Sequence, residues 1–142
     1  MPPLPPLSPF THVLIVDDDE NIRALYRHAL ETAAYPVYEA HDGAAALRVL
    51  RASVHPMVVL LNLWLPGLDG ALMLAAVANE ETLATRHVYV LVSSIPPARV
   101  GLLGVLLTRL HALVLAHPWK QDTLLATVAQ AAARLPARVE QP

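Results

Sequence analysis

The chain has 142 residues, of which 55% are apolar and 15% are charged, and it contains no cysteine. This length allows one compact domain with a core, and this composition excludes a disordered chain and a disulfide scaffold. The formal net charge is -2, with ten Lys and Arg residues against twelve Asp and Glu residues, and the absence of a basic run gives no electrostatic basis for nucleic-acid binding.

The chain begins with a proline-rich segment, residues 1–10, that lacks the basic start and the apolar run of a signal peptide. Pro3 and Pro6 form a P-x-x-P arrangement, which we interpret as part of a passive tail. We place the folded domain at residues 11–136 and a short C-terminal tail at residues 137–142.

The first four predicted elements alternate between strand and helix. Residues 12–16 are apolar, rich in β-branched side chains and followed by three aspartates, which is typical of a buried strand whose end meets water. Apolar residues then recur at helical spacing over residues 22–33. Residues 35–40 predict a second strand, and the alanine-rich segment at residues 43–50 predicts a second helix.

The middle of the chain repeats this alternation. Residues 57–61 are continuously apolar and predict a third strand, after which Pro66 and Gly67 interrupt the chain. Residues 71–78 predict a helix, and residues 88–92 predict the fourth strand.

The last three predicted elements are a helix at residues 98–107, a strand at residues 111–115 and a helix at residues 119–135. The whole chain is therefore predicted to contain five successive units, each a strand followed by a helix. Parallel strands need crossover connections, which the helices supply. We predict a doubly wound α/β domain with helices on both faces of a mostly parallel sheet.

The most apolar window, residues 100–116, is the only candidate for a membrane span. Arg109 and His111 lie inside it and Gly101 and Gly104 interrupt it, whereas a span needs about 20 predominantly apolar residues. We expect no membrane insertion and a cytoplasmic location.

Polar residues follow the predicted strands at the points where the apolar runs end. In an open α/β sheet the carboxyl ends of the strands meet at one edge, where ligands bind. The residues expected to converge there are Asp17, Asp18, Asn62, Ser93, Ser94 and His117. Asp19 is expected to cap the following helix, and the other six histidines are interpreted as surface or packing residues.

Four stretches, VLIVDDDENIRAL, LLNLWLPGLDG, VYVLVSS and LVLAHPW, occur in the order and spacing found in receiver domains of two-component response regulators. The chain resembles this family from about residue 11 to residue 135. The resemblance implies a flavodoxin-like sheet of order 2-1-3-4-5 and a module that takes phosphate from a partner histidine kinase.

The same resemblance implies roles for individual residues. Asp17 and Asp18 match the acidic pair that helps to bind magnesium, and Ser93 matches the hydroxyl that contacts phosphate. Asn62 stands where the family has its phosphate-accepting aspartate, and His117 stands where it has a lysine. Trp64 follows on the loop that would form the rim of the pocket.

The departures at Asn62 and His117 predict a degenerate receiver. An amide is neutral and poorly nucleophilic, so Asn62 cannot form the acyl phosphate that a carboxylate forms. A site of Asp17, Asp18 and Asn62 also lacks one carboxylate for Mg²⁺, so we expect weak metal binding. Imidazole, with a reference pKa of about 6.5, is a weaker phosphate ligand than an ammonium group.

We therefore expect a non-enzymatic module that acts by contact with a signalling partner, a histidine kinase or an output protein. No output domain follows Leu135, which predicts a stand-alone module. The fourth predicted helix is more apolar than one buried stripe requires, so we expect a homodimer through the face of helix four, strand five and helix five. The residues expected on that face are Leu102, Leu103, Val105 and Leu106.

Three alternatives are open. The first is a receiver that is still phosphorylated, on Ser93, on a neighbouring acidic residue or after deamidation of Asn62. The second is a haloacid-dehalogenase-type phosphatase, because Asp17 and Asp19 form a D-x-D pattern after an apolar strand, although no later lysine and acidic pair accompanies it. The third is a flavodoxin-like electron carrier, which would place carboxylates where a phosphate-cradling loop is needed.

Overall fold

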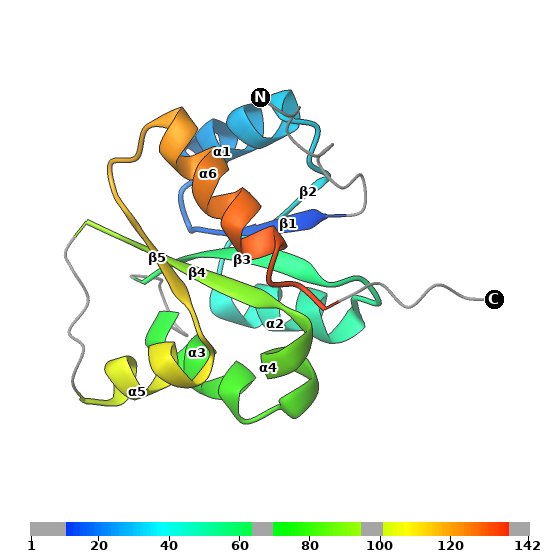
Figure 1. The fold of residues 1–142 in the computed structure, drawn as a ribbon, viewed down its shortest axis with the longest axis vertical. Coiled ribbons are helices and arrows are strands. Elements are labelled where there is room, and N and C mark those ends of the chain that lie inside the picture. The colour runs from blue at the N-terminus through cyan, green and yellow to red at the C-terminus, as the bar shows by residue number, and fades with distance from the viewer. Residues whose placement is uncertain (1–10, 64–69, 95–100, 137–142) are drawn as a thin grey trace.

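In the computed structural model of the chain, which describes residues 11–63, 70–94 and 101–136, five parallel strands form one sheet of order β2-β1-β3-β4-β5 with helices on both faces (Figure 1). The strands are β1 His12–Val16, β2 Val37–Ala40, β3 Met57–Asn62, β4 Val88–Ser93 and β5 Leu113–Ala116. The helices are α1 Glu20–Thr32, α2 Gly43–Ala52, α3 Gly70–Ala78, α4 Glu81–Arg86, α5 Gly101–Arg109 and α6 Gln121–Ala132. The predicted doubly wound fold and strand order are confirmed.

The strands are apolar without alternation because both faces of the sheet are covered. Side chains at alternate positions of a strand point to opposite faces, so Val13 and Ile15 of β1 pack with α1 and α6, whereas Leu14 and Val16 pack with α2, α3, α4 and α5. Figure 1 shows the same division, with α1 and α6 on one side of the sheet and the other helices below it.

Two helices on opposite faces begin at aspartates that follow a strand. Asp19 caps α1 by accepting hydrogen bonds from the backbone N–H groups of Asn21 and Ile22, which confirms the capping role predicted for it. Asp42 caps α2 in the same way and accepts from the N–H of Ala45 at 2.7 Å. Both caps satisfy helix N–H groups that have no partner within the helix.

The predicted starts of the second and fifth strands are wrong by two residues each. Ala34 and His111 have positive φ angles, of 67° and 52°, in the left-handed region that ends helices. Each closes the preceding helix, as the hydrogen bond from the His111 N–H to the Thr108 carbonyl shows. The strands begin only after these turns, at Val37 and Leu113.

Helix α4 was not predicted, and α6 is shorter than the predicted helix over residues 119–135. Only Leu83 of α4 is buried, so this short helix lacks the apolar periodicity that marks a longer one. Lys120 is extended and precedes α6. Residues 98–100 of the helix predicted at 98–107 lie outside the described residues, as do the two predicted tails.

No helix in the described parts of the chain has the length and apolar content to cross a membrane. The apolar window that was the candidate for a membrane span is divided between α5 and β5.

Candidate functional site

The carboxyl ends of four strands meet around a cavity of about 340 Å³. Strand register places Asn62 beside Val92 and Ser93 beside Ala116, and the N–H of His117 donates to the Ser93 carbonyl at 2.9 Å. Since all four strands are parallel, residues far apart in sequence reach the same edge of the sheet. The cavity is lined by Asp17, Asp18, Asp19, Ile22, Tyr26, Asn62, Val92, Ser93, Ser94 and His117.

Asp17 is the buried acid of this site, with 6% of its surface exposed. Its Oδ1 accepts the N–H of Asp19 at 2.9 Å, and its Oδ2 accepts Nδ2 of Asn62 at 3.2 Å. Burial raises the pKa of Asp17 above its usual value and the nearby charge of Asp18 adds to this, while the Asp19 and Asn62 hydrogen bonds oppose it. Both carboxylate oxygens therefore already have donors from the protein.

Asn62 lies at the end of β3, half-buried, with its amide N–H directed at Asp17. The hydrogen bond joins the ends of β1 and β3, which are 45 positions apart in sequence. An amide in this position compensates the buried carboxylate without carrying a charge of its own. The direct contact between Asn62 and Asp17 was not predicted.

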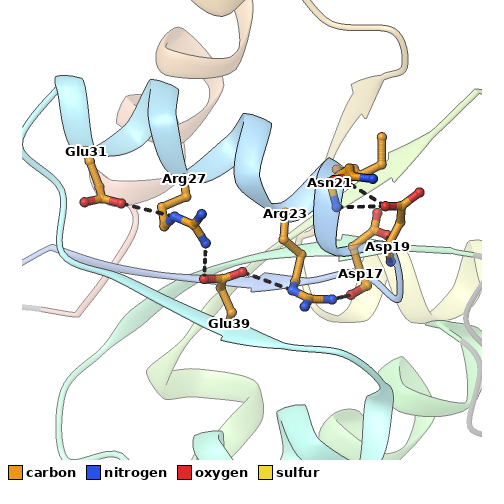
Figure 2. Close-up of polar contacts among 8 residues, drawn as sticks. Asp17, Asp19, Asn21, Arg23, Arg27, Glu31 and Glu39 are labelled. Atoms are coloured by element: carbon orange, nitrogen blue, oxygen red, sulfur yellow. Dashed lines mark hydrogen bonds and ion pairs between the residues drawn. The ribbon is translucent and has the colours of Figure 1, made fainter.

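Arg23 fixes the backbone of the acidic turn, as Figure 2 shows. Its Nη1 donates to the Asp17 carbonyl at 2.8 Å, and its Nε lies 3.0 Å from Oε1 of Glu39 on β2. Arg27 contacts the other oxygen of Glu39 at 2.6 Å. Arg23 was missed because its contacts with Asp17 and Glu39 depend on the pairing of β1 with β2. Its position one turn into α1, close to the acidic turn, is the feature of the sequence that could have identified it.

Tyr26 lines the cavity and packs against Trp119. Their ring centroids are 4.9 Å apart, and Tyr26 is 3% exposed. Burial raises the pKa of the Tyr26 hydroxyl to about 12, so this group stays protonated at neutral pH. The contact joins α1 to the segment between β5 and α6, beside His117.

The other predicted site residues have different outcomes. Ser93 is buried and His117 is exposed, and both line the cavity. Trp64 lies outside the described residues.

The apolar face predicted on the fourth helix of the pattern, which is α5, is only partly present. Leu102 and Val105 are 65% and 60% exposed, and Leu103 is half-buried against the core. The prediction that Leu106 lies on this face is wrong, because Leu106 is 4% exposed and packs in the core beneath α5.

The donor set at this edge of the sheet does not fit a tight metal site. The described residues contain no cluster of three His, Cys, Asp or Glu side chains that could hold an ion. Mg²⁺ prefers carboxylate oxygens and water, whereas the third group beside the two aspartates is the Asn62 amide, whose N–H faces Asp17.

A family model of the response regulator receiver domain matches residues 13–103. Among curated relatives, the transcriptional regulatory protein CseB of Streptomyces coelicolor is 40% identical over 72 residues, which are 51% of this chain and 30% of that protein. Regulatory protein AtoC of Escherichia coli K12 is 32% identical over 76 residues, which are 54% of this chain and 16% of that protein. The chain thus spans less than a third of the length of these relatives.

Solved structures share the fold over most of the chain. A putative response regulator from Chloroflexus aurantiacus superposes with a TM-score of 0.75 at 25% identity, covering 89% of this chain and all of that one. The chemotaxis protein CheY4 of Vibrio cholerae superposes with a TM-score of 0.74 at 24% identity, covering 86% of this chain and 98% of that one.

Proposed function

Because the chain belongs to the response regulator receiver family, we propose that it is a receiver-like signalling module that is not phosphorylated at the usual position. Its output in a two-component or phosphorelay system is contact with another protein, a histidine kinase or an output protein. It catalyses no reaction of its own. The cytoplasmic location expected from the sequence is part of this proposal.

The observation that carries the proposal is the hydrogen bond from Asn62 to Asp17. By the resemblance of its motifs to those of the family, Asn62 is assigned in this proposal to the position of the phosphate acceptor. Its nitrogen is directed at the Asp17 carboxylate, and an amide oxygen lacks the charge and nucleophilicity that attack on a phosphoryl group requires. The Asn62–Asp17 pair supports a conformation that is held by a hydrogen bond within the protein.

The remaining members of the pocket support the same proposal. Ser93 keeps the hydroxyl of the phosphate-contact position, but His117 offers an exposed imidazole in place of a lysine ammonium. We propose Trp64 as part of the rim. With Asp17 already accepting two hydrogen bonds, binding of Mg²⁺ to Asp17, Asp18 and Asn62 is weak.

The surface proposed for contact is the face of α5, β5 and α6, and the side chains proposed to take part are the exposed Leu102 and Val105 and the half-buried Leu103. It is unfavourable to leave the exposed side chains of Leu102 and Val105, which lie on one helix, in contact with water. Exposed apolar patches commonly mark interaction sites. A second copy of the chain is the proposed partner on this face.

The decisive experiment is intact-mass spectrometry after incubation with acetyl phosphate and Mg²⁺. We expect the native chain to gain no phosphate and the Asn62→Asp variant to gain one. Hydroxylamine, which cleaves acyl phosphates, then returns the variant to its starting mass.

A phosphate on the native chain would overturn the proposal, and fragment masses would then identify Ser93, an acidic residue or deamidated Asn62 as the acceptor. Ser93→Ala is the matched control for the hydroxyl. Hydrolysis of a generic phosphoester that is lost in Asp17→Asn would instead support a phosphatase.

A further inference from the structure

An apolar groove of about 330 Å³ lies between α1 and the connection from β5 to α6. Five of its eight lining residues are apolar, namely Ile22, Leu25, Ala29, Pro118 and Trp119. Leu25 is 59% exposed, so a leucine side chain in this groove is in contact with water. The described part of the domain thus leaves an apolar surface uncovered beside an aromatic ring.

Two polar side chains stand in the same groove. His28 and Gln121 line it together with Trp119, and both are exposed. An imidazole and a side-chain amide can each donate a hydrogen bond. A polyproline II helix has no internal hydrogen bonds, so its carbonyl groups take donors from outside, and P-x-x-P segments dock in aromatic-lined grooves. The chemistry of the groove therefore suits a proline-rich segment.

The chain itself carries a segment with the matching pattern. Residues 1–10, MPPLPPLSPF, contain five prolines. A polyproline II helix has three residues per turn, so Leu4 and Leu7, which are three positions apart, lie on one face of such a helix. We call this the leucine face. Pro2, Pro5 and Ser8 lie on a different face, which would point away from a surface that the leucine face contacts.

The groove is within reach of this segment. Seven residues separate Leu4 from Thr11 and span about 22 Å in polyproline II geometry. Strand β1, which starts directly after Thr11, has five residues and spans about 17 Å. Leu25 and Ala29 lie in the second and third turns of α1, which runs back from the carboxyl end of β1. The leucine face can thus extend as far as the groove.

We propose that the proline-rich segment, residues 2–9, docks in this groove as a polyproline II helix, with its leucine face against Leu25 and Trp119. The carbonyl groups of the segment then accept hydrogen bonds from His28 and Gln121. A short covalent linker supplies an effective concentration in the millimolar range, so an intrinsic dissociation constant of about 1 mM is enough to keep the groove occupied about half of the time.

This contact goes beyond the proposed function, because it requires neither phosphate chemistry nor another protein. It gives the P-x-x-P segment a role in place of the passive one that its composition alone suggests. The domain then presents to a partner an α1 face that is covered by its own chain.

The test uses the full chain, which has no cysteine and can therefore carry one nitroxide label, on Pro2→Cys. The readout is the loss of peak intensity in two-dimensional amide NMR. We expect the label to broaden the amide signals of Leu25, Ala29 and Gln121 strongly and to leave that of Thr85, on α4 across the sheet, nearly unchanged. Equal broadening at all four amides, or none at the first three, would overturn the proposal.

Substitutions in the labelled chain test the two sides of the contact. Leu4→Ser combined with Leu7→Ser removes the leucine face, and Leu25→Ser changes the groove at an exposed side chain, where the fold tolerates substitution. Each should abolish the broadening. Val54→Ser, at an apolar residue that is 81% exposed between α2 and β3, is the matched control and should keep it. Broadening that persists in both test variants would contradict docking in this groove.

A mixing experiment establishes whether the segment occupies the groove of its own chain. Nitroxide-labelled protein at natural isotope abundance is mixed with ¹⁵N-labelled protein that carries no nitroxide. We expect no broadening in the mixture, because the contact is intramolecular. Broadening of the groove amides in the mixture would overturn this assignment and place the segment of one copy in the groove of a second.

Discussion

At the scale of single residues, the contact between Asn62 and Asp17 is the main departure from what the resemblance implied. The sequence predicted a missing nucleophile, whereas the structure contains an additional hydrogen bond between two strands. A carboxylate at position 62 would face the buried Asp17 across the same distance, and two like charges so close disfavour ionisation of both.

The first prediction follows from that pair. Asn62→Asp should lower the free energy of unfolding by about 1–3 kcal/mol in EDTA, because a charge-assisted hydrogen bond is replaced by a repulsive contact. Mg²⁺ should restore the stability of this variant by binding between the carboxylates. Thermal unfolding with and without Mg²⁺ measures both effects.

Asn62→Ala is the matched control, since it removes the hydrogen bond and adds no charge. It should lose about 1 kcal/mol and gain nothing from Mg²⁺. If Mg²⁺ stabilised the native chain as much as Asn62→Asp, the proposed weak metal binding would be wrong.

His87 is a second residue whose chemistry is set by its surroundings. It is 2% exposed, and its Nδ1 accepts the N–H of Met57 at 3.0 Å, which leaves the proton of the neutral ring on Nε2. Burial lowers the pKa of His87 from 6.5 to about 4, and the positive charge of Arg86 adds to this. A hydrogen bond with the Leu50 backbone raises the pKa by a smaller amount.

This gives a prediction for pH. Between the unfolded pKa of 6.5 and the folded pKa of about 4, the unfolded chain takes up a proton at His87 and the folded chain does not. The contribution of His87 to stability is thus complete above pH 6.5 and is lost as the pH falls, by a total of about 2–3 kcal/mol. Urea unfolding from pH 7 to pH 4 measures it.

His87→Asn is the variant for comparison, because the Asn carbonyl can accept the Met57 N–H but does not titrate. Its unfolding free energy should fall less steeply with decreasing pH over the same interval. A parallel pH dependence in both proteins would assign the effect to other groups.

At the scale of elements, the start of α3 is fixed by close packing on the end of β3. The N–H of Gly70 donates to the Leu63 carbonyl at 3.0 Å. A Cβ at position 70 would lie 2.7 Å from that oxygen and 2.8 Å from the Asn62 carbonyl. Both are backbone atoms that cannot move without shifting the strand end that carries Asn62.

Gly70→Ala should therefore lower the free energy of unfolding by about 2–3 kcal/mol, the upper part of the range for overpacking. Gly101 is the matched control: it starts α5 with φ +77° and has nothing within 4 Å of an added Cβ, so Gly101→Ala should cost only the backbone strain of about 1 kcal/mol. Urea unfolding compares the two, and equal losses would contradict the packing argument.

The elements that could be predicted are those whose apolar pattern is long and regular. Strands β1, β3 and β4 were predicted to within one residue because both of their faces are buried. The starts of β2 and β5 depend on left-handed turns at Ala34 and His111, residue types that do not signal such a turn in sequence.

The residues that line the site could be predicted from the sequence, but the contacts between them could not. Strand ends identified Asp17, Asp18, Asn62, Ser93 and His117, all of which line the cavity. Arg23 and Tyr26 were missed because their contacts with Asp17 and Trp119 arise from the packing of α1 on its neighbours, which periodicity alone does not specify.

At the scale of the whole molecule, the exposed apolar side chains are unevenly distributed. Leu102 and Val105 lie on one helix, while Val54, which is 81% exposed, lies alone between α2 and β3. Leu102 and Val105 are three positions apart on α5, and the proposed homodimer depends on this pair.

We expect sedimentation velocity at micromolar concentration to show a dimer of the native chain. A double variant, Leu102→Ser with Val105→Ser, should be monomeric, with its unfolding free energy changed by no more than about 0.5 kcal/mol per site because the side chains are already exposed. Val54→Ser should remain dimeric. A native monomer under these conditions would exclude this face as a self-association surface.

The strand order also has a consequence for the chain during synthesis. Strand β4 is buried along its whole length, and one of its edges is covered only by β5, the last strand to emerge. Until β5 and α6 are available, β4 presents an open apolar edge. The unpaired backbone groups of such an edge can pair with a strand of another molecule. Proteolytic loss of the segment after α5 would recreate that edge, so such a fragment should aggregate.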